Sequence, residues 1–182
     1  TELATGYWGS MTLLALNEIG VFSALGGVPR SAADVTEELG SDLRATTLLM
    51  NAGVALGLLT KDADGRYANG PEAAAFLVPG GPAFLGGALR YALDVFAPWG
   101  GLPAAARTGA AQVPETDYLG GDPARTERFV RGMHGRAMGF AQGVVANLDL
   151  GDKTRLLDVA GGSGAYSLLL CGRHSALGAT VC

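Results

Sequence analysis

One stretch near the end of the 182-residue chain constrains its fold more than any other. It runs Leu156-Leu157-Asp158-Val159-Ala160-Gly161-Gly162-Ser163-Gly164. The apolar start predicts a short strand, the small residues predict a turn, and the apolar residues after Tyr166 predict a helix. Ligands of parallel sheets bind at the carboxyl ends of strands, and a turn of small residues lets its backbone N–H groups approach a ligand closely. We therefore expect the start of an α/β domain with a ligand-binding loop.

Two common nucleotide motifs fit this stretch poorly. The dinucleotide fingerprint G-x-G-x-x-G, started at Gly162, meets Ser167 where Gly or Ala is required, and started at Ala160 it lacks its first Gly. A P-loop needs a Lys followed by Ser or Thr after the glycines, and the sequence has no such pair there. The loop therefore belongs to another ligand class.

The first 80 residues predict a small helical domain. Helices are expected over residues 7–25, over 31–39 with Ser31 as N-cap, and over 42–58, where Leu43, Leu48, Leu49, Val54 and Leu58 would form the apolar face. Residues 59–68 hold an Asp-Gly turn typical of a β-hairpin, and Pro71 would open a further helix. Three helices and a hairpin are the order of a winged helix.

A winged helix could bind DNA through its third helix, so a transcriptional regulator is one alternative function. That helix would then need exposed basic or amide side chains, but its only such residues are Arg44 and Asn51. The net charge of −4 also argues against a nucleic-acid partner. We expect a domain used for packing and dimerisation.

The composition of the chain further limits its location and its partners. Apolar residues make up 48% and charged residues only 16%, which favours a large apolar surface buried against a second subunit. No apolar run approaches the roughly 20 residues of a membrane span, and neither a signal peptide nor a metal-binding cysteine pattern is recognised. We expect a cytoplasmic protein with no membrane partner and no metal.

Residues 81–150 would form a helical linker that contributes to a substrate pocket. An apolar helix is expected over 83–99, and Asp122-Pro123 would begin a long helix that ends near Leu148. Phe129, Met133 and Arg136 share one face of that helix by their spacing. His134 is expected to be an ordinary surface or partly buried histidine.

The order of these parts resembles a known family. Residues 156–164 follow the order two apolar residues, Asp, an apolar residue, a small residue, any residue and then Gly-x-Gly. This order is similar to motif I of S-adenosylmethionine-dependent methyltransferases. With a winged-helix front and a linker that carries Trp99, Arg107-Thr108-Gly109, Tyr118 and Asp122-Pro123, the chain resembles the small-molecule O-methyltransferases of plants and bacterial natural-product pathways. The resemblance covers the chain and about the front half of a family member.

The resemblance implies an S-adenosyl-L-methionine site. Ala160, Gly161, Gly162 and Gly164 would surround the methionine part of the cofactor, and Asp158 would orient the loop and meet the ammonium group. Family members commonly have Gly at the position of Ala160, and Ala would be tolerated there if its φ is negative. Phe129 and Met133 match positions that line the substrate region, with Arg136 nearby on the same face.

The resemblance also implies what the 182 residues lack. The acid that holds the ribose hydroxyls is expected directly after the strand that ends at Cys182, and the catalytic base is expected downstream as well. Residues 151–182 would be the start of a truncated Rossmann-like domain. The implied function is methyl transfer to a hydroxyl of an aromatic or polyketide-like metabolite by a homodimer joined through its N-terminal helices. A non-methylating dimeric scaffold is the second alternative.

Overall fold

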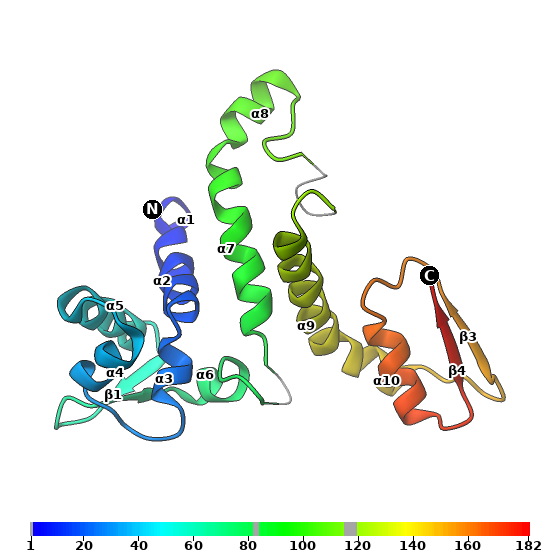
Figure 1. Ribbon diagram of the computed structural model, residues 1–182, viewed down its shortest axis with the longest axis horizontal. Coiled ribbons are helices and arrows are strands. Elements are labelled where there is room, and N and C mark those ends of the chain that lie inside the picture. Colours follow the sequence, from blue (N-terminus) through cyan, green and yellow to red (C-terminus); the bar gives the residue numbers. More distant parts are fainter. Residues whose placement is uncertain (1, 82–83, 115–119) are drawn as a thin grey trace. The chain divides into compact units, whose positions relative to one another are not determined.

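The computed structural model describes residues 2–81, 84–114 and 120–182, and the chain divides after Asp94 into two compact units. The first unit is built from helices and one hairpin (Figure 1). Its elements are α1 (Glu2–Thr5), α2 (Tyr7–Glu18), α3 (Val21–Leu25), α4 (Ala32–Leu39), α5 (Leu43–Ala55), β1 (Leu59–Lys61), β2 (Tyr67–Asn69), α6 (Pro71–Phe76) and the first part of α7 (Gly86–Gly100). Ala83, the first residue of the helix predicted over 83–99, lies outside the described residues.

The helix boundaries of the first unit follow local signals in the sequence. Gly20 has a φ of +88°, which separates α2 from α3. The Ser31 hydroxyl accepts a hydrogen bond from the Asp34 backbone N–H, and the Asp34 side chain accepts one from the Ser31 backbone, which completes a capping box. Hydrogen bonds from Ser31 hold the pKa of the Asp34 carboxyl below its usual range. Asp42 caps α5 by accepting from the Ala45 N–H at 2.7 Å.

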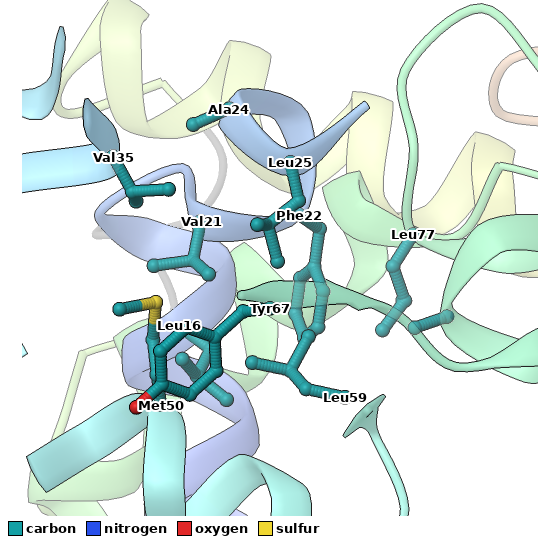
Figure 2. Packing of buried hydrophobic residues seen from close by; sticks show 11 residues of the cluster. Leu16, Val21, Phe22, Ala24, Leu25, Val35, Met50, Leu59, Tyr67 and Leu77 are labelled. Carbon is teal, nitrogen blue, oxygen red and sulfur yellow. The ribbon is translucent and has the colours of Figure 1, made fainter. Parts of the chain in front are cut away.

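The core of this unit gathers around Tyr67, which is 1% exposed (Figure 2). The buried side chains around it come from α2, α3, α4, α5 and β1, and they include Leu16, Val21, Phe22, Leu25, Val35, Met50 and Leu59. The Tyr67 hydroxyl donates to Asn51 Oδ1 at 2.7 Å, and the Lys61 ammonium lies 4.6 Å from the ring centroid. The amide that a DNA-binding third helix would offer is therefore engaged with the hairpin.

The predicted apolar face of α5 is only partly right. Leu49, Val54 and Leu58 pack against the core, but Leu43 and Leu48 are 51% and 55% exposed. The fully buried positions are Thr46, Met50 and Gly53. A Cβ on Gly53 would lie 2.8 Å from Leu16 Cδ1, so the close approach of α2 selects a small residue on the inner face. Tertiary contact, rather than side-chain hydropathy, therefore sets the orientation of α5.

The second unit contains the predicted strand, loop and helix. Its elements are the end of α7, α8 (Leu102–Thr108), α9 (Pro123–Asn147), β3 (Arg155–Asp158), α10 (Ala165–Arg173) and β4 (Gly178–Val181). Strands β3 and β4 pair in parallel, with Arg155 opposite Gly178 and Asp158 opposite Val181, and α10 connects them. Asp122 caps α9 by accepting from the Ala124 N–H at 2.9 Å.

Helices α9 and α10 pack together over one side of this strand pair. Val145, Leu170 and Leu177 form the buried centre, and Leu156 packs against them. Leu157 is 65% exposed on the other side of β3. The core of the unit therefore fixes α9 against α10 and holds the start of α10 at the end of β3. Among the described residues, no helix is long and apolar enough to cross a bilayer.

Arg30 provides a test of how the first unit is held together. Its guanidinium donates to the backbone carbonyls of Ala24, at 2.7 Å, and Asp34, at 3.1 Å, and pairs with Glu38. We expect Arg30→Met to lower the free energy of unfolding by about 2 kcal/mol in urea denaturation, because the partly buried carbonyl of Ala24 loses a charged donor.

Arg90→Met is the matched control for this substitution. Arg90 lies in the same unit and its guanidinium is 3.8 Å from Glu18, with both side chains more than half exposed. Its loss should change the free energy of unfolding by less than about 0.5 kcal/mol. Equal effects of the two substitutions would contradict the structural role of Arg30.

Candidate functional site

The glycine-rich loop lies between β3 and α10, at the carboxyl end of the parallel strand pair. Pairing of the two strands continues past their last regular residues at this end. The Cys182 N–H donates to the Asp158 carbonyl at 3.0 Å, and the Ala160 N–H donates to the Cys182 carbonyl at 2.7 Å. These bonds fix the first residue of the loop to the end of β4. The loop closes on itself where the Gly164 N–H donates to the Gly161 carbonyl at 2.9 Å.

Every second residue of the loop has a left-handed backbone. The φ angles of Ala160, Gly162 and Gly164 are +57°, +56° and +67°. Ala160 is the one non-glycine residue with a positive φ among the residues described. The condition under which Ala would replace Gly here without strain, a negative φ, is therefore not met. Because Ala160 donates its N–H to Cys182 while the chain turns away from β3, the hydrogen bond holds it in a conformation that costs an L-residue about 1 kcal/mol or more.

The Asp158 carboxylate is held directly beneath the loop. The Ser167 hydroxyl, on the first turn of α10, donates to Asp158 Oδ2 at 2.6 Å, and Ser167 is buried. A Cβ on Gly161 would lie 2.5 Å from Asp158 Cγ, so the carboxylate occupies the space that a side chain at Gly161 would need. A Cβ on Gly162 would meet no atom within 4 Å, which leaves open space in front of that residue.

Helix α9 also reaches the loop, through a residue for which the sequence predicted no functional role. His134 Nδ1 and Ser163 Oγ are 2.8 Å apart and share a hydrogen bond. His134 is half-buried, as expected, but its partner in the loop was not foreseen. The spacing of His134 from the buried residues Ala141 and Val145, seven and eleven positions later, is the signal that could have placed it on the packed face of α9.

The predicted substrate-pocket residues lie on a different face of α9. Phe129 and Met133 are half-buried, and Arg136 is exposed. Phe140, on the same face by spacing, is 70% exposed. This face is turned by about a third of a revolution from the one that carries His134, given 3.6 residues per turn. Tyr118, one of the linker residues behind the family resemblance, lies outside the described residues.

The groups of this loop are suited to ligand binding. In the described part of the chain, no three His, Cys, Asp or Glu side chains gather as metal ligands do. Cys171 and Cys182 are free thiols. What the loop presents is exposed backbone beside a carboxylate, which suits a ligand with an ammonium group.

The chain is similar to known O-methyltransferases. Residues 1–79 match the family described as the O-methyltransferase dimerisation domain. The whole chain is 37% identical to the 3-hydroxy-5-methyl-1-naphthoate 3-O-methyltransferase of Streptomyces sahachiroi, and covers 53% of that protein. Across 98% of the chain it is 31% identical to the tetracenomycin polyketide synthesis 8-O-methyl transferase TcmO of Streptomyces glaucescens, and covers 54% of it.

A solved structure shares the fold. Human N-acetylserotonin methyltransferase in complex with SAM has a TM-score of 0.89 over 99% of the chain, at 24% identity, and 56% of that protein is covered. The chain spans about half the length of the curated relatives it matches. Residues 1–79 thus match an O-methyltransferase dimerisation domain, and the chain as a whole is similar in sequence to O-methyltransferases of bacterial natural-product pathways.

The positive φ of Ala160 gives a prediction about stability. We expect Ala160→Gly to raise the free energy of unfolding by about 0.5–1 kcal/mol, because relief of the left-handed strain exceeds the entropy cost of a glycine. Ala137→Gly, in the interior of α9, is the matched control and should lower it by about the same amount. Urea titration measures both. A loss of stability in both variants would contradict the backbone geometry at Ala160.

Proposed function

We propose that this protein is an S-adenosyl-L-methionine-dependent O-methyltransferase that acts on a hydroxyl of an aromatic or polyketide-like metabolite. The observation that carries the proposal is a glycine-rich loop over a carboxylate at the end of β3, in a chain whose first 79 residues match an O-methyltransferase dimerisation domain. The transcriptional regulator finds no support in the relatives, which are named as methyltransferases. The non-methylating scaffold is the alternative that an activity assay must separate.

The residues of the loop fit this cofactor. Asp158 Oδ2 already accepts from Ser167, but a carboxylate can accept about four hydrogen bonds, so it keeps capacity for an ammonium group. Open space before Gly162 lets a ligand lie against the backbone of residues 160–164. S-adenosyl-L-methionine bound there supplies a sulfonium methyl group to an oxygen nucleophile.

Each predicted site residue has a role in this proposal. Asp158 accepts from the ammonium group and sets the loop position. Ala160, Gly161, Gly162 and Gly164 offer backbone around the methionine part. Phe129, Met133 and Arg136 contribute to the acceptor pocket. The ribose-binding acid and the catalytic base stay predictions for positions downstream of Cys182.

We also propose the finer architecture that these parts suggest. The helices and hairpin of residues 1–80 correspond to a winged helix, residues 81–150 to a linker, and the β3–α10–β4 unit in residues 151–182 to the start of a Rossmann-like domain. A right-handed α/β sheet begins with such a parallel pair joined by a helix. A cytoplasmic location is part of the same proposal.

The dimer contact is proposed to involve the N-terminal helices. Leu3 is 99% exposed on α1, and Trp8 and Tyr7 are 61% and 52% exposed at the start of α2. The rings of Tyr7 and Trp8 contact each other edge to face, with 6.0 Å between centroids. Apolar and aromatic groups gathered on one surface are typical of the centre of a subunit interface. The dimerisation-domain match supports the same assignment.

An activity assay tests the proposed reaction. We expect a polypeptide that carries these residues together with the predicted downstream acid and base to transfer a methyl group from S-adenosyl-L-methionine to hydroxylated naphthoates or related polyketide phenols, a substrate class suggested by the names of two relatives. Mass spectrometry should detect a product heavier by one methylene unit. Matched acceptors without the hydroxyl should give none. Cofactor binding without turnover of any phenol would favour the scaffold.

Asp158→Asn tests the cofactor site. The substitution keeps the shape of the side chain and removes its charge, so we expect calorimetry to show about ten- to hundredfold weaker binding of S-adenosyl-L-methionine. Asp152→Asn is the control, since Asp152 is exposed and pairs with neighbouring Lys153. Unchanged affinity in Asp158→Asn would remove the carboxylate from the site.

Trp8→Glu tests the proposed interface. A carboxylate in the middle of an apolar contact is costly to bury, so sedimentation velocity should detect monomers where the unaltered protein forms dimers. Val28→Glu is the control, because Val28 is 63% exposed in the connection between α3 and α4. A dimer that persists in Trp8→Glu would place the interface elsewhere.

A further inference from the structure

Ser163 has a special position in the glycine-rich loop. Between Gly161 and Gly164 it is the only residue with a side chain, so its hydroxyl is the only side-chain group there by which another element can hold the loop. Its neighbours Gly162 and Gly164 both have left-handed backbones, and glycine loses more conformational freedom on ordering than any other residue. A loop of this composition needs an external contact to stay in one conformation.

Helix α9 supplies that contact through His134. The two partners are 29 residues apart in sequence, and their side chains meet at 2.8 Å. The helix that carries His134 is well fixed, because Ala141 and Val145 on the same face are 0% and 4% exposed and Val145 packs against Leu170 of α10. The loop is therefore bonded to a helix that is itself packed onto the helix following the loop.

The hydrogen bond acts on the part of the loop that the strands leave unsupported. At its start, Ala160 is bonded to Cys182, and at its end, Gly164 is bonded to Gly161. Within the described part of the chain, Ser163 is held by a hydrogen bond to His134 alone. Fixing this residue limits the rotation of the backbone next to Gly162, where a Cβ would meet no atom within 4 Å.

We propose that His134 is a positioning residue, which acts through Ser163 to hold the loop in the conformation that binds the cofactor. This inference rests on the proposed function and adds to it a role for α9. His134 touches neither the cofactor nor the acceptor in this assignment. Its effect is to lower the ordering cost of cofactor binding, so its loss should change cofactor affinity and leave the chemical step unaltered.

A double-mutant cycle on the purified protein tests the proposal. His134→Phe keeps the ring and removes the hydrogen bond, and Ser163→Ala removes the other partner. We expect each to weaken S-adenosyl-L-methionine binding about two- to tenfold in calorimetry, the worth of one neutral hydrogen bond. The double variant should bind no more weakly than either single variant, since both remove the same interaction.

Two further variants separate positioning from general stability. His134→Asn can place an amide near the position of Nδ1 and should restore most of the affinity. His174→Phe is the matched control, because this histidine lies at the end of α10 and its Nε2 has no hydrogen-bond partner. The His174→Phe variant should bind S-adenosyl-L-methionine with the same affinity as the unaltered protein. The KM for the cofactor should rise in His134→Phe while kcat and the KM for the acceptor stay constant.

The outcomes distinguish this inference from the proposed function. If the unaltered protein fails to bind S-adenosyl-L-methionine, the proposed function is wrong. If it binds and His134→Phe binds equally well, or if the effects of His134→Phe and Ser163→Ala multiply in the double variant, the positioning role is wrong and the function stands. A lowered melting temperature with unchanged affinity would make His134 a structural residue only.

Discussion

The ligand loop depends on one extension of β-sheet hydrogen bonding. The parallel pairing of β3 and β4 continues to Cys182, whose N–H and carbonyl bond to Asp158 and Ala160. This pairing ends the strand at a fixed point and forces the chain to turn directly above the Asp158 carboxylate. Ser167 then holds that carboxylate from the first turn of α10. The position of every proposed cofactor contact follows from this short pairing.

The loop combines conformational freedom with restraint. Left-handed backbone at residues 160, 162 and 164 turns the chain within five residues and leaves the peptide groups uncovered. Such a backbone gains little from side-chain packing, so its order comes from hydrogen bonds at its two ends and from the His134–Ser163 contact at its middle. The strain at Ala160 is part of the same arrangement, because the bond to Cys182 keeps an alanine where glycine would be relaxed.

The first unit is held together by a different set of contacts. Its core is closed by Tyr67, which connects the hairpin to α5 through Asn51, and by Arg30, which binds the carbonyls of α3 and α4. With these contacts made internally, aromatic and apolar groups of α1 and α2 remain on the surface. A stable fold with an exposed aromatic surface is what a dimerisation domain requires, in agreement with the family that residues 1–79 match.

Sequence alone determined the local structure of this protein, because caps, turns and strand patterns are encoded by neighbouring residues. Ser31, Asp42 and Asp122 begin helices as predicted, and the parallel strand pair lies where the apolar runs indicated. The tertiary structure decided what depends on distant contacts. It turned Leu43 and Leu48 outward because α2 approaches Gly53, and it gave Ala160 a positive φ because Cys182 accepts its N–H. It also brought His134 to Ser163, because this contact joins residues 29 positions apart and depends on the packing of α9 on α10.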